Sequence, residues 1–379
     1  MSQTQRTHIL QLVASAQGGA ATHLRDLVLG LPSDRFQSTA GMPLDNGNVT
    51  PADFQEAGHK FIEVPIDRGL AWREINRLRL TVEKLKIDMI HAHGARAAMY
   101  ARLMAGGAAR KIPVVFSIHG FATPFYSFPK RNIYLHLERR LQRATSHTIA
   151  VAQAEADLFL SFGLTTADKL SVISYGIDVE RFMTATEKNA ILRTEFGLKS
   201  DNKVILTVCR LHVPRDFETL FEAFKQVQDE MPEARLLIVG DGPQRVELEV
   251  KIQQMGLSKL VRITGYRTDI PQLMQLADIY TLTSYGWEGF PISTMEAQAA
   301  GTPVVVTDAG GSREAVRHEE TGLVVPLQNP VALAEAYRRL LNDDQFREQL
   351  GVAGKRRAEM EFTREAMVQR IVDIYDQVI

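Results

Sequence analysis

Two glutamates in the segment Glu288-Gly-Phe-Pro-Ile-Ser-Thr-Met-Glu296 could bind one polar ligand together. Paired carboxylates first suggest a glycosidase, in which the two groups lie about 5 to 9.5 Å apart. Eight residues of helix cover about 12 Å, which is too long for that pair. The spacing is closer to the length of a nucleotide-sugar, so one glutamate would bind the sugar and the other the ribose. A loop glutamate beside an unrelated, solvated helix glutamate is the alternative.

Basic and glycine residues at other expected strand ends could hold the phosphates of such a ligand. Arg210 and Arg215 follow a strand expected at 204–208, and two guanidiniums can chelate a diphosphate. Gly18 and Gly19 follow the first expected strand, where glycine lets backbone N–H groups approach a ligand closely. The chain has no Asp-x-Asp pair that would hold Mg²⁺ beside phosphates, so we expect cationic side chains to replace a metal. Solvated arginines and an ordinary tight turn are the alternatives.

Histidines in the first half of the chain could be ligands or hydrogen-bonded core residues. His119 follows an apolar run from Val114 and precedes a glycine, which would place its imidazole at the rim of a domain. His91 and His93 are two positions apart on an expected strand and would share a face. Because no third ligand is evident beside them, the sequence predicts no metal site.

These residues must be positioned by strands and helices that alternate along the chain. Apolar, β-branched runs predict two series of strands, separated by a polar stretch after Tyr175: 8–15, 36–42, 60–65, 87–93, 112–119 and 146–151, then 204–208, 234–240, 260–265, 279–284, 303–308 and 322–326. Helical patterns between them predict parallel βαβ units. We therefore expect an α/β protein with two doubly wound, Rossmann-like domains, 1–180 and 181–362, facing each other across a ligand-binding cleft.

Composition excludes several classes of protein. With 379 residues and 45% hydrophobic content, the chain can form two sizeable cores, and its net charge of −1 gives no general attraction to nucleic acid. Cys209 is the single cysteine, so no intrachain disulfide can form. The sequence shows no targeting segment and no run of about 18 apolar residues. These features predict a cytoplasmic protein.

One basic segment suggests a contact with a membrane. Residues 1–190 hold 22 Lys and Arg against 17 Asp and Glu. The expected helix 130–143 carries an apolar stripe of Ile133, Leu137 and Leu141, and it follows an aromatic segment at 121–128. Its positive residues are Lys130, Arg131, Arg139, Arg140 and Arg143. Such a helix could rest on an anionic inner membrane face and admit a lipid-linked acceptor, although a solvated helix packed on the core is the alternative.

Several short motifs occur in a characteristic order along the chain. They are Gly18-Gly19, Ser117-Ile-His-Gly120, Arg210 with Arg215, Val239-Gly-Asp-Gly-Pro243 and Glu288-Gly-Phe-Pro-x4-Glu296. Together they resemble the family-4 retaining glycosyltransferases of GT-B architecture, and the resemblance spans nearly the whole chain. Arg215 stands where the family commonly has Lys, and Asp216 where it has Gly, which leaves the identity of the donor sugar open.

The resemblance implies a role for each candidate residue. Glu288 would contact the donor sugar and His119 the sugar or the reacting centre, while Arg210 and Arg215 would stabilise the departing diphosphate. The nucleotide-sugar would lie against Gly18, Gly19, Arg210, Arg215, Tyr266, Gly289, Phe290, Pro291 and Glu296, with the last of these on the ribose. A helix at 363–379 would pack back on the first domain.

The implied reaction moves a hexosyl unit from a nucleotide-sugar, with a UDP-sugar favoured, to a saccharide or lipid-linked acceptor in cell-surface polysaccharide or glycolipid synthesis. No cofactor or metal would be required. Because no second nucleophile is evident beside Glu288, we expect retention through front-face transfer.

Three alternatives belong to other classes. A nicotinamide-dependent oxidoreductase is disfavoured because the loop from Gly240 has Arg245 in place of its third glycine. A nucleotide-sugar epimerase would act without an acceptor, and a catalytically silent nucleotide-sugar binder would show affinity without turnover.

Overall fold

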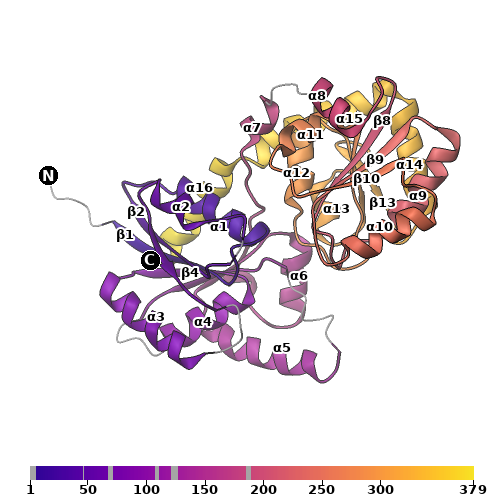
Figure 1. The fold of residues 1–379 in the computed structure, drawn as a ribbon. Helices are drawn as coiled ribbons and strands as arrows, with labels where there is room; N and C mark the ends of the chain where they lie inside the picture. Colours follow the sequence, from indigo (N-terminus) through magenta and orange to yellow (C-terminus); the bar gives the residue numbers. More distant parts are fainter. Residues whose placement is uncertain (1–5, 46, 67–70, 107–110, 121–126, 185–188) are drawn as a thin grey trace. The chain divides into compact units, whose positions relative to one another are not determined.

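The structure, a computed structural model, describes residues 6–45, 47–66, 71–106, 111–120, 127–184 and 189–379. The chain divides into two compact units, which we call unit 1 (Met1–Gly176 with Arg364–Ile379) and unit 2 (Ile177–Thr363). Figure 1 shows the last helix, in yellow, among the elements of unit 1. Each unit is built around a parallel sheet with helices packed on its faces.

Unit 1 contains a sheet in the order β3-β2-β1-β4-β5-β6-β7, in which every pair of neighbours is parallel. The strands that the described residues form are β1 (Thr7–Val13), β2 (Phe36–Met42), β3 (Lys60–Glu63), β4 (Met89–His93), β5 (Val114–Ser117), β6 (His147–Ala150) and β7 (Leu170–Val172). The sequence predicted the first six, but β7 was not expected. It is a short, partly exposed edge strand without an apolar run.

Helices cover both faces of this sheet because alternate side chains of each strand point in opposite directions. They are α1 (Gly19–Gly30), α2 (Pro51–Gln55), α3 (Trp72–Leu85), α4 (Ala95–Ala105), α5 (Lys130–Leu141), α6 (Gln153–Ser161) and α16 (Arg364–Val378), with short 3₁₀ turns at Gln142–Ala144 and Ala167–Lys169. Leu10 and Leu12 pack with residues of α3 and α4. Ile9 packs on the opposite face with residues of α1 and α16.

The C-terminal helix α16 supplies core residues to unit 1. Ile371 and Tyr375 are fully buried and belong to the cluster that contains Ile9 and Phe36. The Phe36 and Tyr375 rings meet edge to face, with centroids 5.9 Å apart. The core of unit 1 is therefore completed by a segment that lies far away in the sequence.

Unit 2 contains a parallel sheet in the order β10-β9-β8-β11-β12-β13. Its strands are β8 (Lys203–Val208), β9 (Ala234–Val239), β10 (Val261–Gly265), β11 (Ile279–Leu282), β12 (Val304–Thr307) and β13 (Gly322–Val325). Its helices in the described part of the chain are α7 (Val179–Met183), α8 (Asn189–Phe196), α9 (Phe217–Glu230), α10 (Arg245–Gln254), α11 (Ile270–Leu276), α12 (Ile292–Ala299), α13 (Gly311–Ala315), α14 (Pro330–Asn342) and α15 (Asp344–Glu361). The main core joins the apolar faces of α9 and α14 to the strands.

Local sequence explains where several of these helices begin. The carboxylate of Asp216 accepts hydrogen bonds from the Thr219 backbone N–H and hydroxyl at the start of α9. Asn329 caps α14, whose first residue, Pro330, lacks the N–H that would need a partner there. No helix within the described ranges is both long and apolar enough to span a bilayer.

Candidate functional site

Each sheet has one place where the strand order reverses direction. In unit 1 the first strand, β1, has β2 on one side and β4 on the other, and in unit 2 β8 lies between β9 and β11. Loops that leave β1 and β4, or β8 and β11, diverge to opposite sides and open a crevice at the carboxyl ends of the strands. Gly18 and Gly19 follow β1, Arg210 and Arg215 follow β8, and Glu288 follows β11, whereas His119 follows β5 and Tyr266 follows β10.

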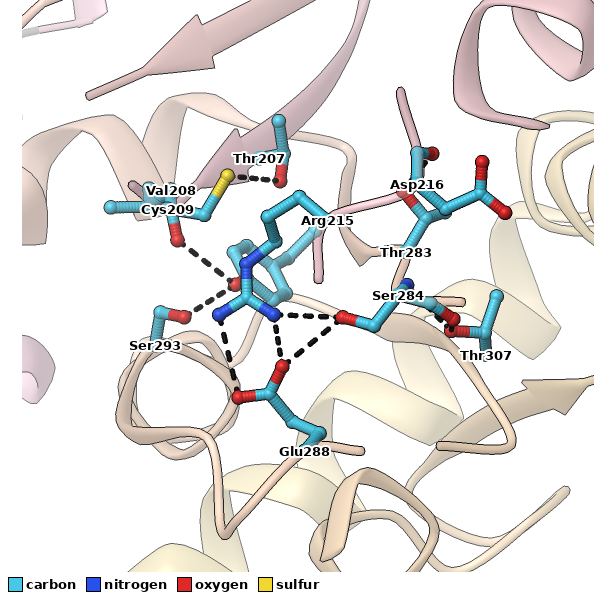
Figure 2. A network of polar contacts seen from close by, with 11 residues as sticks. Thr207, Val208, Cys209, Arg215, Asp216, Thr283, Ser284, Glu288, Ser293 and Thr307 are labelled. Atoms are coloured by element: carbon cyan, nitrogen blue, oxygen red, sulfur yellow. Dashed lines mark hydrogen bonds and ion pairs between the residues drawn. The ribbon is translucent and has the colours of Figure 1, made fainter. Parts of the chain in front are cut away.

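In unit 2 the structure joins two of the predicted residues directly. The Arg215 guanidinium, after β8, forms an ion pair with the Glu288 carboxylate, after β11, and also donates to Ser284 Oγ at 2.7 Å. Ser284 Oγ in turn donates to Glu288 Oε2 at 3.1 Å. Figure 2 shows the guanidinium between these two partners. The ion pair therefore joins two residues that are 73 positions apart in the sequence. It lies at the switch point of the sheet, the place where the strand order reverses.

The ion pair lies in a partly buried environment. The side chains of Arg215 and Glu288 are 17% and 14% exposed. Desolvation lowers the pKa of the Arg215 guanidinium. However, the charge and hydrogen bond of Glu288, together with the smaller effects of Cys209 and Tyr280, raise the pKa above its usual value. Arg215 stays charged, and its guanidinium fixes the orientation of the Glu288 carboxylate.

Neighbouring loops hold the backbone around this pair. Thr307 Oγ1 accepts from the Ser284 N–H at 2.9 Å and donates to the Ser284 carbonyl at 3.0 Å. The Gly311 N–H donates to the Glu288 carbonyl at 3.0 Å. Gly310 has a φ of 52°, and a Cβ at that position would lie 2.6 Å from the Glu288 carbonyl oxygen. Only glycine fits this close approach of two loops.

The remaining residues of the Glu288 segment lead into α12. Gly289 is partly buried, and Pro291 is buried at the N-cap of the helix. The Phe290 ring is buried and meets Phe362 edge to face at 5.7 Å. Glu296 is a partly buried residue on α12. The expected placement of the two glutamates, one in a loop and one on the next helix, is what the structure shows.

Two predicted residues of unit 2 lie apart from the ion pair. Arg210 is exposed just after β8, and no side-chain hydrogen bond or ion pair joins it to another described residue. Tyr266 is 72% exposed directly after β10. Both side chains are therefore exposed to solvent in the structure.

In unit 1 the predicted glycines form the turn from β1 into α1. Gly18 is the N-cap of α1 with a φ of 80°, and Gly19 is the first helical residue. The Gly18 N–H donates to Asn48 Oδ1 at 2.9 Å. The left-handed conformation explains why a glycine stands at position 18.

His119 lies two residues beyond β5, and both of its ring nitrogens have partners. Its Nε2 is 3.0 Å from His93 Nδ1, and its Nδ1 is 2.8 Å from the Tyr175 hydroxyl. The His119 and Tyr175 rings stack, with 9° between their planes. Burial lowers the pKa of His119 well below its ordinary value, and the nearby histidines lower it further.

A chain of buried hydrogen bonds connects His119 to the C-terminal helix. His93 Nε2 donates to Gln11 Oε1 at 3.0 Å, so His93 Nδ1 accepts from His119 Nε2–H. The Gln11 amide donates to the Tyr375 hydroxyl at 3.0 Å, and that hydroxyl lies 2.7 Å from His91 Nδ1. The orientation of the Gln11 amide therefore determines which atom donates and which accepts in the hydrogen bonds from His119 through His93 to Gln11.

Known proteins with related sequences identify the class of this chain. The model for Glycosyltransferase Family 4 matches residues 17–181, and the model for Glycosyl transferases group 1 matches residues 189–357. A glycosyltransferase of Methanocaldococcus jannaschii, named as uncharacterized, is 30% identical over 305 residues, which are 76% of this chain and 75% of the relative. The chain belongs to the family-4, group 1 glycosyltransferases.

Two further proteins resemble this glycosyltransferase. The UDP-Gal:alpha-D-GlcNAc-diphosphoundecaprenol alpha-1,3-galactosyltransferase of Escherichia coli is 29% identical over 269 residues, covering 69% of this chain and 68% of the relative. A crystal structure of Anabaena HepE in complex with UDP and glucose is similar with a TM-score of 0.86 and 24% identity, covering 98% of this chain and 100% of that one. The expected GT-B fold, with two doubly wound parallel sheets, is confirmed.

Sequence reasoning about this glycosyltransferase missed several residues that surround the candidate site. His23, on α1, is 3% exposed, and its ring lies 5.0 Å from that of His119. Gln11 and Tyr375 were not singled out, although a glutamine inside an apolar strand is a signal of a buried hydrogen bond. His91 and His93 do share a face, with ring centroids 4.1 Å apart.

Proposed function

We propose that this glycosyltransferase moves a hexosyl unit from a UDP-sugar to a saccharide or lipid-linked acceptor, with retention of configuration, in the synthesis of a cell-surface polysaccharide or glycolipid. The observation that carries the proposal is the ion pair of Arg215 with Glu288 at the switch point of unit 2. HepE was crystallised with UDP and glucose, and the name of the E. coli relative gives UDP-Gal as donor and a diphosphoundecaprenol acceptor. These names support the choice of donor base and acceptor class.

Unit 2 binds the donor in this proposal. Glu288, oriented by Arg215, accepts hydrogen bonds from sugar hydroxyls, with the backbone of Gly289, Phe290 and Pro291 alongside. Glu296 binds the ribose hydroxyls, and Tyr266 lies near the base. The exposed Arg210 takes the diphosphate, because Arg215 is already engaged by a carboxylate.

Unit 1 binds the acceptor and supplies His119 to the sugar or the reacting centre. The domain assignment is 1–180 together with the helix 363–379 for the acceptor, and 181–362 for the donor. In this proposal Gly19, at the start of α1, offers its backbone N–H to the diphosphate, and Gly18, whose N–H is bonded to Asn48, forms the turn that allows this approach.

Transfer proceeds on the front face of the sugar without a metal at the diphosphate. A carboxylate held by a guanidinium is a weak nucleophile, which disfavours a covalent intermediate on Glu288. The positive charge of Arg210 stabilises the departing diphosphate instead, while Arg215 stays paired with Glu288 and orients that carboxylate.

We also propose that α5 touches an anionic membrane from the cytoplasmic side. Two residues of the apolar stripe predicted for this helix are not core, because Ile133 is 63% exposed and Leu137 is 43% exposed, whereas Leu141 is partly buried. Arg131, Arg139 and Arg140 are exposed on the same helix. Exposed apolar side chains among positive charges suit an interfacial helix. The aromatic residues 121–126 that precede it lie outside the described residues.

Donor binding is tested by calorimetry with UDP, UDP-glucose, UDP-galactose and GDP-mannose, with and without EDTA. We expect a UDP-sugar to bind in EDTA, and Arg210→Ala to weaken its binding at least about tenfold through loss of charge-assisted hydrogen bonds. Arg356→Ala is the matched control, because Arg356 is an exposed residue of α15 in the same unit. Preference for GDP-mannose contradicts the choice of base, and binding that needs a divalent ion contradicts metal independence.

Transfer itself is tested with the bound UDP-sugar and a panel of saccharide and lipid-linked acceptors. An α-anomeric product from an α-donor, assigned by NMR, supports retention, and Glu288→Gln should lower kcat by about 100-fold or more. A β-anomeric product contradicts it. Interconversion of UDP-sugars without an acceptor indicates an epimerase, and binding without any turnover indicates a silent binder.

Membrane contact is tested by flotation with vesicles. We expect binding to phosphatidylglycerol vesicles that decreases as salt rises, and no binding to phosphatidylcholine vesicles. Ile133→Asp with Leu137→Asp should abolish it. Equal binding to both kinds of vesicle, or no binding at low salt, contradicts the proposal.

A further inference from the structure

Three imidazoles converge at the switch point of unit 1. His23 lies on α1, His93 ends β4, and His119 follows β5. One ring nitrogen of each lies within 4.8 Å of those of the other two. The ring of His23 is centred 5.3 Å from that of His93 and 5.0 Å from that of His119. Figure 1 shows α1 and β4 next to each other in unit 1.

The second observation is that His23 is buried with its hydrogen-bonding capacity unused. Its side chain is 3% exposed, and neither ring nitrogen has a hydrogen-bond partner among the described residues. A buried polar group without a partner has lost its contacts with water and gained none in the protein, so such a group calls for an explanation. A bound metal ion would use one of these nitrogens.

The other two histidines already have the outer contacts that metal ligands show. His93 Nδ1 and His119 Nε2 face each other at 3.0 Å. Their remaining nitrogens are held by oxygens, His93 Nε2 by Gln11 and His119 Nδ1 by Tyr175. Histidines that bind a metal usually bond an oxygen through the second nitrogen, which fixes the ring. An ion would replace the single hydrogen bond between the two rings. The His119 proton would then move from Nε2 to Nδ1 and be donated to the Tyr175 hydroxyl, so both outer contacts would remain.

We propose that His23, His93 and His119 form a binding site for one divalent transition-metal ion of the zinc class. Tetrahedral zinc, with Zn–N bonds of about 2.0–2.1 Å, holds its ligand nitrogens about 3.4 Å apart. The pair at 3.0 Å is close to that value, and His23 needs to approach by about 1.4 Å at most. Three neutral imidazoles select Zn²⁺, Co²⁺, Ni²⁺ or Cu²⁺ over Mg²⁺ or Ca²⁺, which prefer oxygen. The fourth position is left for water or a ligand.

One consequence rests on the proposed function. There His119 contacts the donor sugar or the reacting centre, and an ion on its Nε2 would hold the ring away from that role. Zn²⁺ therefore inhibits transfer, EDTA restores it, and His23→Leu makes transfer resistant to Zn²⁺. If Zn²⁺ binds at the triad and transfer is unaffected, the metal site stands while the role of His119 fails.

The site itself is tested without any assay of transfer. Co²⁺ is added to the full-length protein after dialysis against a chelator, and we expect the visible absorption of tetrahedral Co²⁺ to saturate at one equivalent. Because the loss of an outer contact alone weakens metal binding about 10–100-fold, His23→Leu, which removes a ligand, should bind at least about 100-fold more weakly. His136→Gln, at an exposed position on α5, should bind like the unmodified protein. Absence of the band, or equal binding by His23→Leu, overturns the proposal.

A second measurement needs no variant. With ¹⁵N-labelled histidine, one equivalent of Zn²⁺ should shift the ring signals of His23, His93 and His119, while that of His136 stays fixed. Unchanged signals from the three rings also overturn the site.

Discussion

At the scale of single residues, the ion pair of Arg215 with Glu288 combines stability with orientation. Its atoms are too buried for water to screen them fully, and Ser284 binds both partners. Removing one partner leaves the other with an unsatisfied, partly buried charge. Replacing both charged side chains leaves no unpaired charge and costs only the packing and hydrogen bonds that the two side chains made.

This difference gives a double-mutant test. We expect Arg215→Met and Glu288→Gln each to lower the free energy of unfolding by about 1–3 kcal/mol, and the double variant to cost at least about 1 kcal/mol less than the sum. Urea unfolding of the four proteins measures this. Strictly additive losses contradict a coupled pair.

Gly310 offers a second test at the same scale, because its Cβ would clash with the Glu288 carbonyl. Gly310→Ala should destabilise the protein by more than about 1 kcal/mol and weaken donor binding. Gly197→Ala is the matched control: Gly197 has a similar φ of 65° but no atom within 4 Å of the added Cβ. If both variants lose the same stability and affinity in urea unfolding and calorimetry, the clash is unimportant.

At the scale of elements, α16 does more than fill a hydrophobic face. Its Tyr375 hydroxyl links Gln11 of β1 to His91 of β4, and through them reaches His93 and His119. The C-terminal helix therefore takes part in ordering the protons of a histidine network in the centre of unit 1.

Tyr375→Phe removes that link. We expect a loss of about 1–3 kcal/mol in unfolding free energy, because two buried groups lose a partner, together with changed ¹⁵N ring signals of His91. Tyr337→Phe is the control, since Tyr337 is an equally buried tyrosine in unit 2 whose hydroxyl bonds Thr281. Its histidine signals should match those of the unmodified protein. Unchanged His91 signals in Tyr375→Phe would mean that the hydroxyl does not order the network.

At the scale of the whole molecule, the two units have separate cores. Ile371 is fully buried in unit 1 and Leu340 in unit 2. Ile371→Ala and Leu340→Ala should each cost about 2–5 kcal/mol in the unit that contains them. Hydrogen exchange, followed by mass spectrometry, should show loss of protection in unit 1 only for the first variant and in unit 2 only for the second. Equal loss in both units would mean that they unfold together.

The sequence allowed the alternation of strands and helices to be predicted because the buried strands are continuous apolar runs. It did not reveal β7, α7 or α8, which are short and lack such runs. Glu288 and Arg215 were predicted separately, but their pairing depends on β8 and β11 becoming neighbours. His23 was missed because a single histidine on a helix carries no sign of what it will face.

The position of α16 also sets the order in which the protein can be made. Unit 1 receives Met367, Ile371 and Tyr375 from the end of the chain, after all of unit 2 has been translated. At about 5–20 residues per second, roughly 190 further residues take about 10–40 seconds of ribosome time. Throughout that interval the face of the sheet around Ile9 is covered by α1 without α16, so unit 1, which is translated before unit 2, is completed only after it.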